Sequence, residues 1–270
     1  MSDQLEATAI SPEQRAYLAR IRLRKTVVRV TQLSIFVLFF VVWEWLANRQ
    51  VLDAFLTSQP SRLIQTMVRL YREGVLFGHT GITCLETILG FLSGTICGTV
   101  IATFLWWSDF WAKVCEPYLV VLNSLPKIAL APVVIVWIGA GPEAIIVMAL
   151  AISLIVTILE VFNGFGAVDP DQVKLVQTFG ANRWQVFTKV ILPASFPTII
   201  NALKINVGLS WVGVIVGEFL VSKAGLGYLI VYGGQVFQLD LVMASVFILA
   251  VAAAVMYQAV VYLEKILVKQ

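Results

Sequence analysis

Long apolar stretches, separated by shorter polar segments, run along almost the whole chain. A helix that crosses a membrane needs about 20 consecutive, mostly apolar residues. Six stretches come close to this requirement. They cover residues 27–47, 82–106, 118–138, 143–162, 196–221 and 240–263. The pattern therefore predicts an all-α integral membrane protein with six transmembrane helices.

The connection between the first two spans has a different pattern. After Pro60, apolar residues recur at helical spacing with arginines among them, which is typical of an amphipathic helix at the membrane interface. Gly74, Gly78 and Gly81 are expected to end this helix. The predicted division of the chain is a cytoplasmic segment 1–26, a first transmembrane helix 27–47, an external amphipathic connection 48–80 and a core of five spans, 81–266.

The second span contains a glycine series. Gly90, Gly94 and Gly98 are spaced four residues apart and share one helix face. In lipid, small residues at this spacing let two helices approach closely. We therefore expect a second helix to pack against this face.

The third span contains helix-breaking residues. A short polar turn is expected at 110–117, and the span that follows is interrupted by Pro126 and Pro132. Broken helices within a membrane are tolerated where protein or a water-filled cavity covers the freed backbone groups. The third span is therefore a candidate element of a transport pathway.

The composition identifies lipid as the surrounding solvent. The chain of 270 residues is 59% hydrophobic and 13% charged, with a mean hydropathy of +0.89. A soluble domain is about half apolar and about a quarter charged, so the outer surface of this chain is expected to be apolar too. The net charge of +3 is not gathered in one patch, and nucleic-acid binding is not expected.

The positions of the 19 lysines and arginines orient the spans. Six spans place both termini on one side, and basic residues are enriched in cytoplasmic segments. Most of the basic residues lie in segments assigned to the side of the termini. Both termini are therefore predicted to be cytoplasmic.

Metal and thiol chemistry is not expected. The three cysteines form no CxxC pair, and His79 is the only histidine. The cysteines are interpreted as small packing residues. No catalytic residue, metal site or cofactor is predicted in this chain.

The polar loop 163–193 carries the strongest local signals. Asp169 is expected to cap a helix that begins at Pro170, with Asp171 in its first turn. Gly180 is expected to end this helix, and Asn182 to cap a second helix that Pro193 stops. The pattern predicts a helix–turn–helix on the cytoplasmic side.

Exposed apolar residues distinguish this helix pair from a simple linker. Those expected on its surface are Leu175, Phe179, Trp184 and Phe187. They indicate either a docking element for a cytoplasmic partner or a loop that packs only on its own spans.

Polar groups within the spans are candidates for a translocation pathway, because their burial in lipid is costly. Glu218 is the first candidate; the alternative is that it pairs with Lys127 or Lys223 and holds helices together. Lys127 follows Pro126 and either faces a cavity or pairs with a carboxylate. Glu86 begins the second span and is expected near an interface. The remaining candidates are Asn123, Ser124, Asn206, Ser210 and Trp211.

Residues 174–193 resemble the loop signature of permease subunits in bacterial ATP-binding-cassette (ABC) importers. The family pattern is Glu-Ala-Ala, three residues, Gly, nine residues, Ile, one residue and Leu-Pro. This chain has Gly180, Val190 in place of Ile, and Leu192-Pro193, but Lys174-Leu-Val176 in place of Glu-Ala-Ala. The segments 125–132, 137–139 and 225–230 are similar to the nitrate/sulfonate/taurine branch, and the resemblance covers about residues 80–266.

The resemblance implies a type I importer permease (MetI-like) fold in a bacterial plasma membrane. It implies a dimer of two permease copies that forms the pathway, two cytoplasmic ATP-binding subunits and an external solute-binding protein. ATP and magnesium would bind to the partner ATPase, since no GxxxxGK(S/T) loop occurs here. The residues implied in coupling to the ATPase are Asp169, Asp171, Leu175, Gln177, Thr178, Phe179, Gly180, Ala181, Asn182, Arg183 and Trp184.

Two other classes of protein would need different sequence features. An ion-driven secondary transporter would use the broken third span but would not need the capped helix pair. A membrane-embedded enzyme would need paired carboxylates, a Cys/His arrangement or HExxH, and none is visible. The substrate expected from the resemblance is a small anion, such as a sulfonate, taurine or nitrate, or a heterocycle, such as a pyrimidine precursor or flavin.

Overall fold

Residues 12–267 are described by a computed structural model, in which every regular element is a helix. The chain forms two compact units, residues 1–64 and residues 65–270. Because their relative placement is not determined, each unit is described separately. Residues 1–11 of the expected cytoplasmic segment lie outside the described part.

The first unit consists of α2 (Pro12–Asn48), α3 (Ala54–Thr57) and the start of α4 (Pro60–Arg72). Helix α2 begins well before residue 27, because residues 13–48 contain no glycine or proline that would break a helix. Near its end, the Glu44 carboxylate accepts hydrogen bonds of 3.0 Å from both the backbone N–H and the hydroxyl of Ser61. Glu44 therefore caps the first turn of α4 within this unit.

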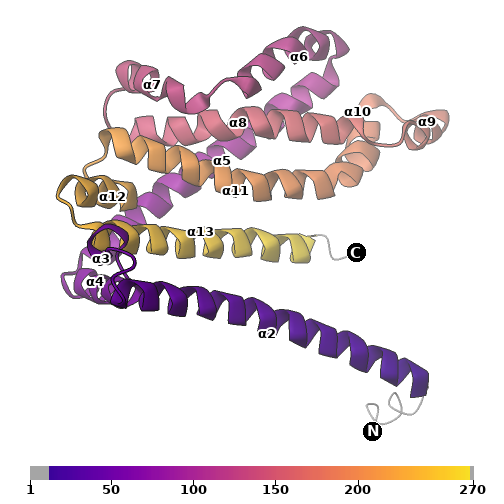
Figure 1. Cartoon of the computed structure of the whole chain (residues 1–270). Coiled ribbons are helices and arrows are strands. Elements are labelled where there is room, and N and C mark those ends of the chain that lie inside the picture. Colours follow the sequence, from indigo (N-terminus) through magenta and orange to yellow (C-terminus); the bar gives the residue numbers. More distant parts are fainter. Residues whose placement is uncertain (1–11, 268–270) are drawn as a thin grey trace. The chain divides into compact units, whose positions relative to one another are not determined.

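The second unit is organised around three long helices, α5 (Val75–Trp107), α8 (Pro142–Gly166) and α11 (Leu192–Val221). Helices α8 and α11 lie side by side, and α5 packs against both (Figure 1). Helices α12 (Leu226–Gln235) and α13 (Leu239–Leu267) complete the unit.

The glycine series of α5 forms the contact with α8, which confirms the expected close approach. A Cβ atom at Gly90 would lie 2.5 Å from Cβ of Ala149. One turn further along both helices, Gly94 faces Ser153, and after another turn Gly98 faces Thr157. The absence of side chains at these positions lets the two backbones come together.

Five helices of the described part are long and apolar enough to cross a membrane, and a bent helix pair makes a sixth candidate. This pair joins α6 (Asp109–Ser124) to η1 (Lys127–Leu130) and α7 (Ala131–Ile138) at an angle of 90°. The predicted interruption of the span 118–138 is present as this sharp bend, and the helix before it begins at Asp109 instead of residue 118.

The prediction of a polar turn at 110–117 is wrong. These residues are helical, because Ser108 caps α6 by accepting the N–H of Trp111 at 3.5 Å, and the helix continues through Pro117. Pro126 lies at the bend, whereas Pro132 occupies the first turn of α7, where its missing N–H costs nothing.

Two other boundaries differ from the sequence prediction. Gly78 and Gly81 lie inside α5, so only Gly74, with φ +74°, separates α4 from α5. Pro193 does not stop a helix but lies in the first turn of α11, directly after a π-helical turn. A π turn widens the helix locally and accommodates the proline.

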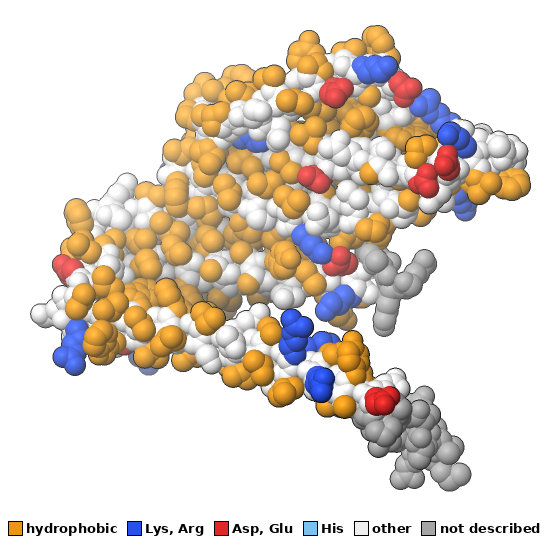
Figure 2. Space-filling model, turned by 45° about the vertical axis from the view of Figure 1, so that its right-hand side comes forward, with side chains coloured by type: hydrophobic (Ala, Val, Ile, Leu, Met, Phe, Trp, Pro, Cys, Tyr) orange, Lys and Arg blue, Asp and Glu red, His pale blue; other side chains and the backbone are white. Residues whose placement is uncertain are grey.

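The surface agrees with a lipid environment. Hydrophobic side chains cover much of the face shown in Figure 2, and a group of charged side chains lies at the end of the second unit that carries α9 and α10. Large apolar side chains that are more than half exposed occur on α5, α6 and α13, for example Phe104, Tyr118 and Val255.

Candidate functional site

The loop between α8 and α11 is a capped helix pair. Helix α9 (Pro170–Thr178) begins after Asp169, whose carboxylate accepts the N–H of Asp171 at 2.9 Å. It ends before Gly180, which has φ +82°, a backbone conformation that favours glycine. The expected start and end of this helix are confirmed.

The second helix of the pair, α10 (Arg183–Val186), begins with a capping box. The Asn182 side chain accepts the N–H of Gln185 at 2.9 Å, and the Gln185 side chain accepts the N–H of Asn182 at 2.9 Å. The helical path then continues through the π turn η2 (Phe187–Ile191) into α11. Helix α10 is therefore joined to the long helix α11 without an intervening loop.

Apolar side chains protrude from this helix pair. Phe179 is 82% exposed, Trp184 62% and Leu175 57%. Phe187 was also expected on the surface, but it is buried, because its ring packs against Trp106 and Phe165 at centroid distances of 4.9 and 5.6 Å. The exposed patch is thus made by Leu175, Phe179 and Trp184.

Arg183 of the helix pair contacts the end of α5. Its guanidinium carbon lies 5.7 Å from the ring centroids of both Trp106 and Trp107, and it donates a hydrogen bond of 3.4 Å to the Trp106 carbonyl oxygen. Arg183 and Gln177 also line a cavity of about 560 Å³ beside α5, α6 and α8. The loop therefore contacts α5 as well as the two helices that it connects.

The bend between α6 and η1 brings three of the pathway candidates together. Lys127 Nζ donates hydrogen bonds to the backbone oxygen of Asn123 at 3.1 Å and to its side-chain oxygen at 3.3 Å. A cation at this place is stabilised by the carbonyl end of α6. Asn123 and Ser124 are exposed and Lys127 is half-buried, so this bend presents a polar surface.

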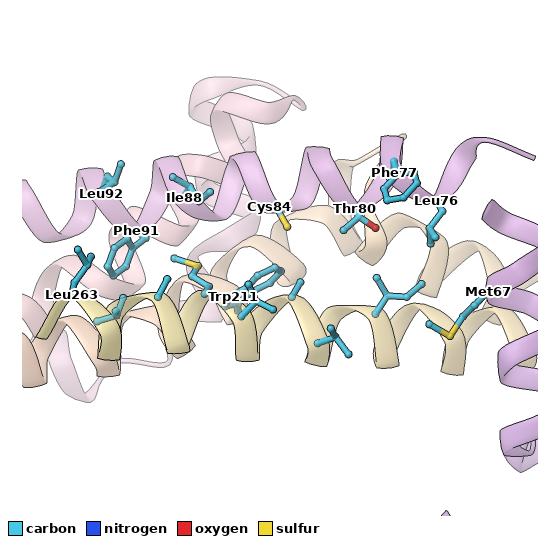
Figure 3. Close-up of a pocket in the computed structure, with 17 residues that line it drawn as sticks. Met67, Leu76, Phe77, Thr80, Cys84, Ile88, Phe91, Leu92, Trp211 and Leu263 are labelled. Carbon is cyan, nitrogen blue, oxygen red and sulfur yellow. The ribbon is translucent and has the colours of Figure 1, made fainter. Parts of the chain in front are cut away.

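Asn206, Ser210 and Trp211 do not join that surface. Asn206 is fully buried and donates a 2.5 Å hydrogen bond to Thr157 of α8, and Ser210 is fully buried as well. Trp211 lines an apolar crevice of about 670 Å³ between α5 and α13, with Phe91 and Cys84 nearby (Figure 3). Within one copy of the chain, Asn206 and Ser210 thus lie between packed helices and Trp211 faces the apolar crevice.

Glu218 lies at the opposite end of the second unit from α9. Its side chain is 1% exposed and accepts hydrogen bonds from the Thr83 hydroxyl at 2.6 Å and from the Gly227 N–H at 2.5 Å. Three ion pairs occur among the described residues, and none includes Glu218. The expected alternative partners, Lys127 and Lys223, therefore do not pair with it.

Two further side chains complete the start of α12. Thr83 Oγ1 accepts the N–H of Leu226 at 2.7 Å, and His79 Nδ1 accepts the N–H of Gly225 at 2.9 Å. The first N–H groups of a helix have no partner within that helix. His79, Thr83 and Glu218 thus supply these partners from α5 and α11.

His79 and Thr83 were not among the residues predicted for a site. The available signal was their four-residue spacing on α5, one turn apart, with Glu86 three residues beyond Thr83. Glu86 was expected near an interface but is only 4% exposed.

The chain is similar to known transport proteins. Residues 90–270 match the family model described as binding-protein-dependent transport system inner membrane component. A putative aliphatic sulfonates transport permease of Bacillus subtilis is 29% identical over 228 residues, 84% of this chain and 83% of that protein. A riboflavin transport system permease of Chloroflexus aurantiacus is 25% identical over 269 residues, 100% of this chain and 98% of that protein.

The fold is shared with solved importers. The structure of a bacterial alginate ABC transporter in complex with an alginate pentasaccharide-bound periplasmic protein aligns with a TM-score of 0.62 and 18% identity, over 95% of this chain and 97% of that chain. The helical fold is that of MetI-like type I importer permeases. The chain therefore belongs to the binding-protein-dependent transport system inner membrane component family, the permease subunits of ABC importers, in the branch of the sulfonate and taurine permeases.

Proposed function

We propose that two copies of this chain form the translocation pathway of an ATP-driven importer in a bacterial plasma membrane. An external binding protein delivers the solute, and two cytoplasmic ATP-binding subunits drive the transport. The helix pair in residues 169–193 couples ATP hydrolysis to the pathway, and both termini are cytoplasmic.

The exposed patch on the helix pair is the observation that carries this proposal. Leu175, Phe179 and Trp184 are all more than half exposed on a loop with charged and polar caps. Burial of one such side chain stabilises a complex by about 1.5–3 kcal/mol, and exposed apolar groups rimmed by polar residues are typical of protein interfaces. The ATP-binding subunit would cover this patch.

Ligand specificity within the pathway is proposed to reside at the bend of α6 and η1. Asn123 and Ser124 are exposed there, and Lys127 supplies the positive charge. This combination suits a small anion such as a sulfonate, and the aliphatic sulfonates permease is among the relatives. A flavin is the second candidate, because a relative that spans the whole chain is a riboflavin permease.

Binding of the ATP-binding subunit tests the coupling role. The full chain is co-expressed with a tagged ATP-binding subunit, and Phe179→Ala is compared with Phe77→Ala. Phe77 is a matched control, since it is 69% exposed but lies at the far end of α5. Phe179→Ala is expected to weaken the complex at least tenfold, about 1.4 kcal/mol, and Phe77→Ala to leave it unchanged. Equal binding by both variants would contradict the proposal.

The assignment of ATP hydrolysis to a separate subunit can be tested independently. The purified chain alone is expected to hydrolyse no ATP, because the family is the permease subunit and its sequence has no phosphate-binding loop. An ion-driven secondary transporter would instead transport without any ATP-binding subunit. Transport by the isolated chain in response to an ion gradient would overturn the proposal.

A further inference from the structure

Two buried carboxyl groups meet at the end of α5 and α11 that adjoins α12. Glu218 is 1% exposed and Glu86 is 4% exposed. Glu86 lies one turn beyond Thr83 on α5, and the Thr83 hydroxyl donates to Glu218, so the two carboxyl groups are neighbours. Among the described residues, they are the only acidic side chains that are buried.

Among the described residues, no lysine or arginine forms an ion pair with either carboxyl group. In that part of the chain, the side chains beside Glu218 are Thr83 and Glu86. His79 cannot be a cation here, because its Nδ1 accepts the Gly225 N–H and therefore carries no proton. Two ionised carboxylates without a counter-ion are not tolerated in an apolar membrane interior.

The hydrogen bonds favour the charged form of Glu218 over that of Glu86. Both oxygens of Glu218 accept a hydrogen bond, Oε1 from the Thr83 hydroxyl at 2.6 Å and Oε2 from the Gly227 N–H at 2.5 Å. Glu86 receives no such donor, and its Oε2 is buried without a partner. Hydrogen-bond donors favour the charged form of the group that they contact, so Glu218 is the carboxylate and Glu86 is the neutral acid.

We propose that Glu86 and Glu218 form a proton-binding site, in which the neutral Glu86 carboxylic acid donates a hydrogen bond to the Glu218 carboxylate. This one proton holds α5 to α11 at the point where Glu218 also caps α12. When the O–H bond of Glu86 breaks, the proton passes to solvent and leaves two adjacent carboxylates, which separate the two helices. The inference concerns this cluster alone and does not depend on the proposed substrate or coupling role.

The other titratable groups around the pair do not replace this proton. On α5 they are His79, which is neutral, and the Cys84 thiol. On α12, Tyr228 faces the pair with its backbone N–H, while its ring stacks on His79 at 6.0 Å. The structure shows no ionisable side chain of α8 or α13 that interacts with either carboxyl group within the described residues.

Infrared spectroscopy of the full chain in lipid nanodiscs tests the site directly. At neutral pH the wild-type protein is expected to show the carbonyl stretch of a protonated carboxylic acid, and Glu86→Gln is expected to remove it. Glu116→Gln is the control, because Glu116 is exposed on α6 and is ionised at this pH. Absence of the band in the wild-type protein, or its persistence in Glu86→Gln, would overturn the proposal.

The pH dependence of unfolding provides a second measurement. Because the folded chain holds a proton that an unfolded Glu releases at neutral pH, stability falls as pH rises. The melting temperature of the wild-type protein is expected to fall as the pH rises above about 4.3, the pKa of an unfolded Glu, until Glu86 itself releases its proton, while Glu86→Gln, which keeps a hydrogen-bond donor but cannot ionise, shows a flatter profile.

Glu218→Gln provides a second infrared test of the site if the Glu86→Gln protein does not fold. It removes the neighbouring charge, so the acid band of Glu86 persists at neutral pH but shifts in frequency. An unchanged band in Glu218→Gln would show that the two groups are not in contact and would contradict the proposed site.

Discussion

The Thr83 hydroxyl and the Glu218 carboxylate meet at 2.6 Å although 135 residues separate them in the sequence. The same hydroxyl oxygen accepts the N–H of Leu226 at 2.7 Å. One side chain of α5 therefore connects the end of α11 to the start of α12. The contact fixes these three helices at the end of the unit remote from the helix pair α9–α10.

Replacing Thr83 by Val should destabilise this junction. Val keeps the shape of Thr but leaves the Leu226 N–H and one oxygen of Glu218 without their partner, which costs about 1–3 kcal/mol for a buried group. Thermal unfolding in detergent micelles is expected to show a melting temperature lowered by several degrees. Thr103→Val is the matched control on α5, since the Thr103 hydroxyl bonds only the Thr99 carbonyl of its own helix. Equal melting temperatures of the two variants would contradict the role of Thr83.

Replacing Gly90 by Ala should separate α5 from α8. The new Cβ would lie 2.5 Å from Cβ of Ala149, which forces the two helices apart at a cost of about 1–3 kcal/mol. Gly81→Ala makes the same change on the same helix where no atom lies within 4 Å, and it should be neutral or slightly stabilising. The melting temperatures of the two variants check this difference. A Gly90→Ala protein as stable as Gly81→Ala would argue against the packing of α5 on α8.

Gly180→Asp should impair the coupling helix pair. A residue with a side chain at φ +82° is strained by about 1 kcal/mol, which shifts α9 relative to α10. The expected result is a reconstituted complex in which solute-loaded binding protein stimulates ATP hydrolysis less than in the wild type. Gly166→Ala is the control, because Gly166 has open space around it and no positive φ. Unchanged ATPase binding and stimulation in Gly180→Asp would argue against this loop as the coupling element.

Arg183→Gln should weaken the link between the loop and α5. The change removes the cation over Trp106 and Trp107, an interaction worth about 0.5–2 kcal/mol. Assembly with the ATP-binding subunit is expected to persist, while stimulated hydrolysis falls several-fold. Asp109→Asn should have little effect, because the Asp109 carboxylate is 3.9 Å from Arg183 and its side chain is 90% exposed. If Asp109→Asn reduces hydrolysis as much as Arg183→Gln, the ion pair and not the aromatic contact makes the link.

The local chemistry of the loop could be predicted from sequence because each signal acts within a few residues. The Asp169 cap, the Asn182 cap and the left-handed Gly180 are all present as expected. Two of the predictions that failed concern prolines. Pro193 and Pro132 begin helices instead of ending them, since proline is tolerated in the first turn, and sequence alone does not show on which side of a proline the helix lies.

The sequence by itself determined that the chain is helical and embedded in lipid, because apolar stretches of membrane length can satisfy their backbone hydrogen bonds only as helices. It also determined that Gly90, Gly94 and Gly98 share a packing face. Only the tertiary structure decided which helix fills that face and which polar groups meet. Glu86, Glu218 and His79 come together because α5, α11 and α12 converge, and such contacts depend on the packing of helices far apart in sequence rather than on local spacing.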